Sequence, residues 1–300
     1  MKGYLSAAPR LNCKRACKGF YGLALVASMH FLMPATALAH PGIGDRIHLL
    51  DDEIATQPDN QYFYIQRSLA HSENGSPQKA MQDIQRANTL GDAVNAAFVR
   101  GVVLYRQGNF NGARQSFDQY LAAYPEHVES LEYRARLLRD AGQNKAALAD
   151  FVSLFALNPA PNPGLYISAA DLMVTLPSYG SDAAITLLDT GMSKLGPVTQ
   201  LQRHAIALEQ QRGNYPAAIS RMNQLPASLR STPHWKIDLA KLYWLNSDQT
   251  RAQALLLAAR SQLDELPRNG MRDAAREELL HMQKQLASEL ALERIATEQP

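Results

Sequence analysis

This sequence contains few cysteines and none of the common catalytic motifs. Its two cysteines, Cys13 and Cys17, both precede residue 20 of a 300-residue chain, so the remainder cannot form an internal disulfide. The patterns H-E-x-x-H, G-x-S-x-G and G-x-x-x-x-G-K-[ST] do not occur, which argues against a zinc protease, a serine hydrolase of that type and a P-loop nucleotidase. With 46% hydrophobic and 19% charged residues, the chain has the composition of a folded protein rather than a disordered or collagen-like one.

Histidine and glycine patterns give no sign of a cofactor. The histidines after residue 39 are scattered, without the paired spacing of metal ligands, and Gly42-Ile43-Gly44 lacks the third glycine of a dinucleotide-binding turn. We therefore expect no metal, no cofactor and no catalysis. An enzyme would have to use those histidines or the acidic pairs Asp51-Asp52 and Glu277-Glu278, and such pairs on helices are ordinarily solvated. The histidines concerned are His40, His48, His71, His127, His204, His234 and His281.

Acidic residues are absent from the first 39 positions. Residues 20–33 form an apolar run, and Ala37-Leu38-Ala39 follows it. A basic start, a short apolar run and a small-residue end are typical of a secretory signal peptide, here cleaved after Ala39. The alternative is an uncleaved anchor, although about 14 apolar residues are short for a bilayer span. The basic residues of this segment are Lys2, Arg10, Lys14, Arg15 and Lys18.

Loss of the leader changes the charge of the chain. Without its five basic residues, 25 of the 30 Lys and Arg remain against 28 Asp and Glu, a net charge of about −3 instead of +2. Basic residues are interleaved with acidic ones, so we expect no nucleic-acid partner. Export without disulfides favours the periplasm as the location.

Internal repetition is the strongest positive signal. A glycine is followed five residues later by alanine in three places, with steps of 33 and 34 residues between units. A larger apolar residue comes four positions after each alanine, and a small residue preceded by arginine stands upstream. These columns hold Gly75, Gly108 and Gly142; Ala80, Ala113 and Ala147; Ile84, Phe117 and Phe151; Ser68, Gly101 and Ala135; and Arg67, Arg100 and Arg134.

The pattern continues toward the C-terminus less regularly. Ala184, Ala218 and Ala252 extend the alanine column at steps of 37, 34 and 34 residues, and the extra residues of the first of these units fall around 176–181. Each unit predicts two amphipathic helices joined at the glycine, which ends the first helix in a left-handed conformation. Small residues allow the two helices to approach closely. One hairpin cannot bury both of its apolar faces, so successive hairpins are expected to stack.

These motifs resemble the tetratricopeptide repeat family. The resemblance covers residues 61–266 in six units and implies an all-α fold, a right-handed α-solenoid of about six helical hairpins. We expect a capping helix at each end, in residues 40–60 and 267–300; a coiled-coil arm is the alternative for the second. Two features depart from the family pattern. The first-helix column usually filled by tryptophan is weak, and arginine replaces the usual leucine. The residues in the first of these columns are Tyr64, Ala97, Leu131 and Tyr166.

The resemblance also implies a partner-binding surface, the concave face lined by the first helix of each unit. Aromatic residues and arginine on such a face are the composition of interface hot spots. The Lys/Asn clamp by which some relatives hold chaperone carboxylates is not matched, since Ile65 and Leu69, Phe98 and Val102, and Glu132 and Arg136 stand there. The residues carried over to this face are Asn95, Phe98, Tyr105, Arg106, Glu129, Glu132, Arg136, Arg139, Lys241 and Trp244.

The arginine column permits two interpretations. Arg67, Arg100 and Arg134 should form a ladder with about 10 Å between neighbours. The structural interpretation pairs them with carboxylates such as Asp83 and Asp150, which share a second-helix column. The functional one makes them a track that recognises anions or carboxylates.

Taken together, the sequence predicts an exported, non-catalytic repeat scaffold that binds a protein or peptide in its concave groove. An envelope-biogenesis or assembly factor of the periplasm and a structural homo-oligomer are the alternatives. The oligomeric state, the partner and the pathway stay open, because repeat scaffolds leave the choice of ligand to a few surface side chains.

Overall fold

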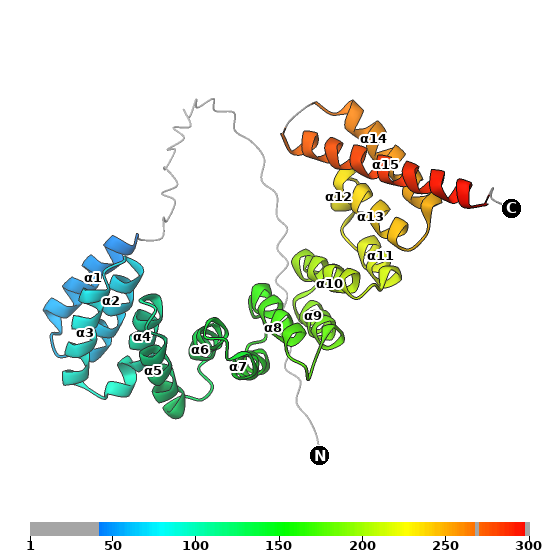
Figure 1. The fold of residues 1–300 in the computed structure, drawn as a ribbon. Coiled ribbons are helices and arrows are strands. Elements are labelled where there is room, and N and C mark those ends of the chain that lie inside the picture. Colours follow the sequence, from blue (N-terminus) through cyan, green and yellow to red (C-terminus); the bar gives the residue numbers. More distant parts are fainter. Residues whose placement is uncertain (1–41, 268–269, 298–300) are drawn as a thin grey trace, which may run out of the picture. The chain divides into compact units, whose positions relative to one another are not determined.

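The structure is a computed structural model that describes residues 42–267 and 270–297. Within these ranges every regular element is a helix (Figure 1). The predicted leader, residues 1–39, lies outside them. None of the helices in the described part is long and apolar enough to cross a membrane.

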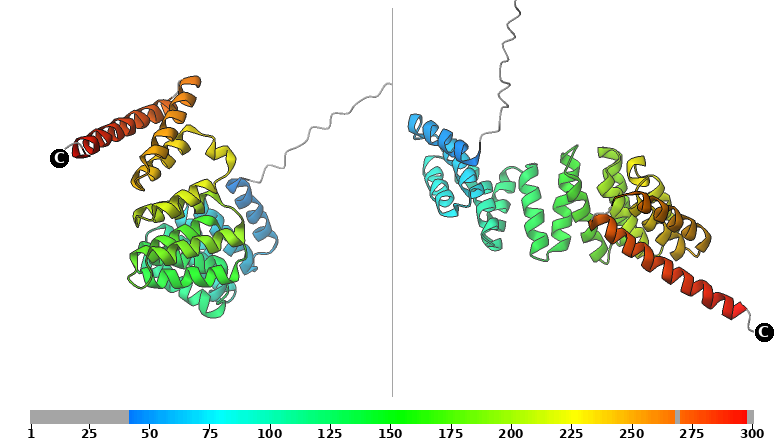
Figure 2. Two further views of the ribbon diagram at one scale, coloured as in Figure 1. Left: turned by 90° about the vertical axis from the view of Figure 1, so that its right-hand side faces the viewer. Right: turned by 90° about the horizontal axis from the view of Figure 1, so that it is seen from above.

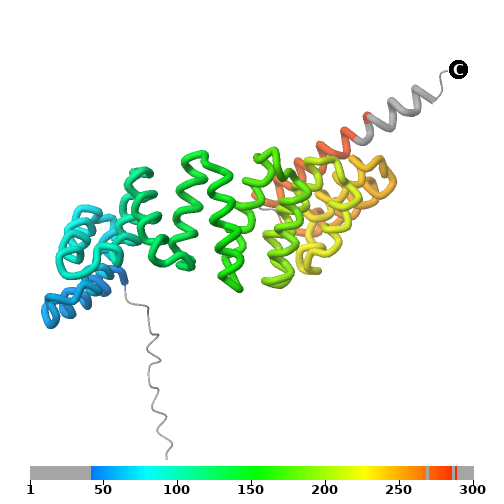
Figure 3. The backbone as a smooth tube through the Cα atoms, turned by 90° about the horizontal axis from the view of Figure 1, so that it is seen from below, coloured from blue at the N-terminus to red at the C-terminus, as the bar shows by residue number. Residues whose placement is uncertain are grey.

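Six helical hairpins follow one another along the chain, as the repeat pattern predicts (Figure 3). In each, the two helices pack closely on each other, and each hairpin contacts the next. The hairpins are α2 (Gln61–Glu73) with α3 (Pro77–Leu90), α4 (Ala93–Arg106) with α5 (Phe110–Ala123), α6 (Val128–Asp140) with α7 (Asn144–Leu157), α8 (Pro163–Thr175) with α9 (Ser181–Leu195), α10 (Thr199–Gln211) with α11 (Tyr215–Asn223), and α13 (Pro233–Leu245) with α14 (Gln249–Glu265).

Three further helices flank or interrupt this row. α1 (Ile43–Thr56) packs on α2, and α15 (Gly270–Thr297) packs on α13 and α14 (Figure 2). The short α12 (Ala227–Arg230) precedes the last hairpin and was not expected from the sequence. The all-α solenoid with a helix before and after the array is therefore confirmed. Ala275, Leu279 and Met282 are the buried residues of α15 among the side chains that the structure describes.

The glycine positions act as helix ends. Gly75, Gly108, Gly142 and Gly213 have φ between 70 and 75°, the left-handed region that glycine adopts most easily. In the last hairpin Ser247 takes the same place with φ 61°. The turn is thus kept where the sequence has lost the glycine, which confirms that unit as a repeat.

The predicted small columns lie where the paired helices approach. Ala80, Ala113 and Ala147 are fully buried, and so are the larger residues that follow them. At Gly101 the helices approach so closely that an added Cβ would lie 2.5 Å from Cε1 of Phe117. The weak tryptophan-like column is nevertheless a core column: Tyr64, Ala97, Leu131 and Tyr166 are all buried. Tyr166 stacks on Phe155 with ring centroids 4.2 Å apart.

Candidate functional site

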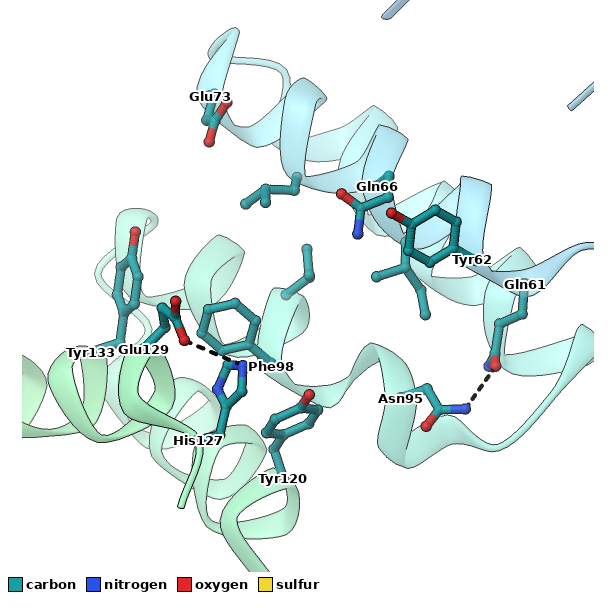
Figure 4. Close-up of a pocket in the computed structure, with 13 residues that line it drawn as sticks. Gln61, Tyr62, Gln66, Glu73, Asn95, Phe98, Tyr120, His127, Glu129 and Tyr133 are labelled. Carbon is teal, nitrogen blue, oxygen red and sulfur yellow. Dashed lines mark hydrogen bonds and ion pairs between the residues drawn. The ribbon is translucent and has the colours of Figure 1, made fainter. Parts of the chain in front are cut away.

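A groove lies on the face formed by the first helices of hairpins one to three. α2 contacts α4, and α4 contacts α6, so their outward-facing residues line a shared cavity of about 600 Å³ (Figure 4). α5 and the loop after it contribute two more side chains. The lining consists of Gln61, Tyr62, Ile65, Gln66, Leu69, Glu73, Asn95, Phe98, Val99, Tyr120, His127, Glu129 and Tyr133.

One wall of the groove is an aromatic cluster centred on Phe98. Its ring centroid lies 5.8 Å from those of Tyr120 and Tyr133 and 5.1 Å from that of His127. Tyr133 in turn stacks with the buried ring of Phe117 at 6.0 Å. Ring pairs at these separations are favourable beyond the area they bury. The wall is therefore held in place from the core of the second hairpin.

His127 is fixed by the start of α6. It is the N-cap residue, and its Nδ1 accepts a hydrogen bond from the backbone N–H of Ser130 at 3.2 Å. Because Nδ1 is the acceptor, a neutral imidazole carries its hydrogen on Nε2. Nε2 lies 3.5 Å from Oε2 of Glu129. The Glu129 carboxylate lies at the mouth of the groove (Figure 4).

The opposite wall comes from α2. Tyr62 stands out with 59% of its surface exposed, and Ile65 and Leu69 continue the apolar surface along the helix. At one end Gln61 ties two repeats together: its Nε2 donates to the carbonyls of Ala87 at 3.0 Å and Asp92 at 2.8 Å. The same side chain accepts from Asn95 Nδ2 at 2.9 Å, so the predicted site residue Asn95 is held by the fold (Figure 4).

The charge of the groove is acidic. Glu73 and Glu129 are the carboxylates of its lining, which includes no lysine or arginine. Burial, with smaller contributions from Tyr124 and Glu129, raises the pKa of Tyr120. Tyr120 therefore stays a neutral phenol at any physiological pH.

Three of the predicted partner-binding residues, Asn95, Phe98 and Glu129, line this groove. Tyr105 lies beside it, with its ring centroid 6.2 Å from that of Tyr133. Its hydroxyl donates to Asp140, and burial followed by this hydrogen bond raises the pKa of Tyr105 to about 12.

The other predicted residues are engaged within the fold. Arg106 donates to Ser72 Oγ at 3.0 Å, and Arg139 donates to Asp140 and Ser168. Arg136 pairs with Glu132 at 2.5 Å, one helical turn away. Lys241 of α13 pairs with Glu278 of α15 at 2.6 Å, and Trp244 packs against the cluster that α15 completes. On the last hairpin, α15 thus takes the place expected for a partner.

Several groove residues were missed from the sequence. Tyr120 and His127 come from a second helix and a loop, whereas the repeat pattern predicts binding residues in first-helix columns alone. Tyr133 is one position beyond the predicted Glu132. Tyr62 and Gln66 lie in the first repeat, and the aromatic residue at 62 was the available signal for them.

The arginines of the column stand on the first helices α2, α4 and α6, and each bonds to the second helix of its own hairpin. Arg67 holds Asp83 through Nε at 2.9 Å and Nη2 at 2.6 Å, and Asp51 of α1 through Nη1 at 2.7 Å. Arg134 repeats this geometry with Asp150 and Asp118, all three bonds being 2.7 Å. The predicted pairs with Asp83 and Asp150 are therefore present.

Arg100 differs from its two neighbours in the column. Its Nε donates to Ser116 Oγ at 2.9 Å and its Nη2 to Gln119 Oε1 at 2.6 Å. No carboxylate of the described residues pairs with it. An anion track along this column would have two of its three members already bound to two carboxylates each. The described residues also contain no group of three or more His, Cys, Asp and Glu placed to hold a metal ion.

A row of stacked helical hairpins with a groove on the first-helix face defines an α-solenoid of the repeat class. A family model described as "Tetratricopeptide repeat" matches residues 98–161, the second and third hairpins. The chain therefore contains tetratricopeptide repeats, and its fold is that of the tetratricopeptide repeat proteins.

One solved structure extends the likeness in fold over most of the chain. The C-terminal part of a tetratricopeptide repeat-containing protein from Cytophaga hutchinsonii is 13% identical, with a TM-score of 0.59 over 78% of this chain and 94% of that one. A tetratricopeptide repeat protein from Parabacteroides merdae is 20% identical, with a TM-score of 0.49 over 75% and 87%. PilF from Pseudomonas aeruginosa is 16% identical, with a TM-score of 0.49 over 66% and 97%. No curated protein matches the sequence.

Proposed function

We propose that this protein is an exported, non-catalytic scaffold that binds a protein or peptide partner on its first-helix face. The observation that carries the proposal is the groove of α2, α4 and α6, where an ordered aromatic wall borders open solvent. Tyrosine and phenylalanine held in this way offer a large contact area with little side-chain entropy to lose. Tetratricopeptide repeat proteins in general are interaction scaffolds, which agrees with this assignment.

Export to the periplasm is part of the same proposal. It rests on the basic and apolar leader of residues 1–39 and the small-residue end at Ala39. Cell fractionation, followed by N-terminal sequencing of the recovered protein, tests it. A chain that begins at His40 in the periplasmic fraction is the expected result, and a full-length chain in the membrane fraction would favour the anchor.

A photocrosslinking amino acid placed at Tyr62 in living cells tests the groove. Tyr62 is 59% exposed and lines the cavity, whereas Tyr179, in the turn before α9, is 49% exposed and lies outside it. We expect a discrete crosslinked protein from position 62 that is absent when the same probe stands at position 179. Equal products from both positions would refute the groove as the binding surface.

The same experiment distinguishes a partner protein from the alternative, a homo-oligomer of this chain. If the crosslinked product from position 62 is a second copy of this chain, the first-helix face is an interface between copies. Sizing of the purified chain and of its Tyr62→Ala variant then decides, because an oligomer built on this groove would dissociate in the variant.

A further inference from the structure

The groove extends beyond the three first helices to α1. A second cavity of about 270 Å³ shares Tyr62, Gln66 and Leu69 with the first and is completed by side chains of α1. The surface therefore runs over α1, α2, α4 and α6, each of which contacts the next. Neighbouring helices lie about 8–10 Å apart, so the four span roughly 25–30 Å. An extended segment of about eight or nine residues has that length.

Carboxylates mark both ends of this extended groove. Glu53 of α1 and Glu129 of α6 stand there, and Glu73 lies between them on α2. The two cavities include a single arginine, Arg46, and its guanidinium is paired with Glu73. Among the described residues no lysine or arginine pairs with Glu53 or Glu129. The groove therefore has a carboxylate without a lysine or arginine partner at each end, and Glu129 has only the imidazole of His127 beside it.

Arginines on the same helices do not alter this balance. Arg106 and Arg136 lie outside the lining of both cavities. Arg136 is paired with Glu132, whereas Arg106 donates to the neutral hydroxyl of Ser72 and keeps its charge at the edge of this face. A ligand carboxylate that enters the groove would meet Glu53 or Glu129, and the lining of the two cavities offers no unpaired cation to receive it. An acidic segment is thus disfavoured by like charge.

The aromatic wall adds a second preference for cations. Glu129 lies on the same side of the groove as Phe98 and Tyr133 (Figure 4). An ammonium or guanidinium group brought to this carboxylate would lie near ring surfaces that attract cations. Between the two ends, Ile65, Leu69 and Val99 provide apolar contacts for neighbouring side chains.

We propose that this extended groove binds an extended segment of a partner protein in which lysine or arginine alternates with apolar side chains. The inference rests on the proposed function of the first-helix face and adds the chemistry of the ligand. The apolar side chains fill the aromatic and aliphatic centre, and the cations reach Glu53 and Glu129.

Three synthetic nonapeptides test the inference. Each repeats the sequence X-Phe-Ser three times, with X being Lys, Ser or Glu, and carries a fluorophore for anisotropy measurements with the chain from residue 40 onward. We expect the lysine peptide to bind at least tenfold more tightly than the serine peptide and the glutamate peptide to bind weakest. The E53Q/E129Q double variant should weaken the lysine peptide by about tenfold, as expected for two solvent-exposed ion pairs, and leave the serine peptide unchanged.

Glu126→Gln is the matched control, since Glu126 is exposed near the groove and does not line it. If E126Q weakens the lysine peptide as much as E53Q/E129Q does, the attraction is diffuse and the proposal fails. If all three peptides bind equally and the Tyr62→Ala variant loses all of them, the groove is a docking surface but its preference for cations is refuted. Binding of none of the peptides, or an affinity for neutral oligosaccharides that exceeds that for the lysine peptide, also overturns the proposal.

Discussion

Removal of the Asp150 carboxylate should destabilise the third hairpin more than removal of any neighbouring charged group does. Asp150 is 10% exposed at its side chain and receives two hydrogen bonds from Arg134, both of 2.7 Å. Asp118 receives one bond of the same length from the same guanidinium but is 46% exposed. The two carboxylates therefore differ in burial and in bond number while they share one partner.

The magnitude follows from this difference. Loss of one member of a fully buried ion pair costs about 3–5 kcal/mol. Arg134 is 23% exposed and keeps Asp118, so D150A should lower the free energy of unfolding by about 2–3 kcal/mol, the range for charge-assisted hydrogen bonds with a partly solvated group. For D118A, an exposed partner, the loss should stay below about 1 kcal/mol.

Urea unfolding followed by circular dichroism measures both variants, and hydrogen exchange of α6 and α7 shows whether the loss is local, since repeat arrays open in segments. The double variant D118A/D150A should lose more than the sum of the single ones, because it leaves Arg134 with neither carboxylate. Losses for D150A and D118A that agree within about 0.5 kcal/mol would refute the assignment of Asp150 as the main partner.

Three further predictions concern other parts of the array. G101A should lower the free energy of unfolding by about 0.5–2 kcal/mol, because the clash with Phe117 costs more than the gain in helix propensity. In the G101A background, F117L should be less destabilising than it is in the wild type. A G101A variant that is more stable than the wild type would contradict the close approach of the two helices. Tyr105, with its pKa raised to about 12 chiefly by burial and then by Asp140, should ionise late in an ultraviolet pH titration, and the signal lost in Y105F should lie above pH 11. Burial lowers the pKa of His71, so its folded form binds a proton less readily than the unfolded chain and stability should fall as the pH drops below about 6.5; H71Q should reduce this fall, and an unchanged profile would contradict it.

The repeat columns could be predicted from the sequence because the residue type in each column has a local structural cause. A residue must leave the helical conformation between paired helices, and Gly75, Gly108 and Gly142 do so at steps that the sequence shows directly. Helix boundaries depend on such neighbours in the chain. Where glycine was replaced, at Ser247, the columns on either side were enough to identify the unit.

The residues of the groove could be predicted from the sequence only in part. Phe98 and Glu129 were found because first-helix positions repeat with the same period as the core. Tyr120 and His127 were not, since they reach this face from a second helix and a loop. Their positions depend on how one hairpin packs on the next, which no pattern within a single unit shows.

The last hairpin shows the same limit. Lys241 and Trp244 lie on the first helix of the last hairpin, and the sequence predicts both as binding residues. The structure places α15 on that helix, where Glu278 pairs with Lys241. A terminal repeat has no successor, so the helix that follows it covers the surface its neighbours leave open.

By itself the sequence determined the all-α class, the six hairpins and the positions of their turns; it offered the pairing of Arg67 and Arg134 with Asp83 and Asp150 as one of two interpretations. All of these follow from spacing along one chain, because helical periodicity and turn geometry act over a few residues. Only the tertiary structure decided which first-helix residues stay open to a partner, that Arg100 lacks a carboxylate, and that an acidic aromatic groove runs from α1 to α6. These features arise where side chains of different repeats meet, and packing between repeats determines them.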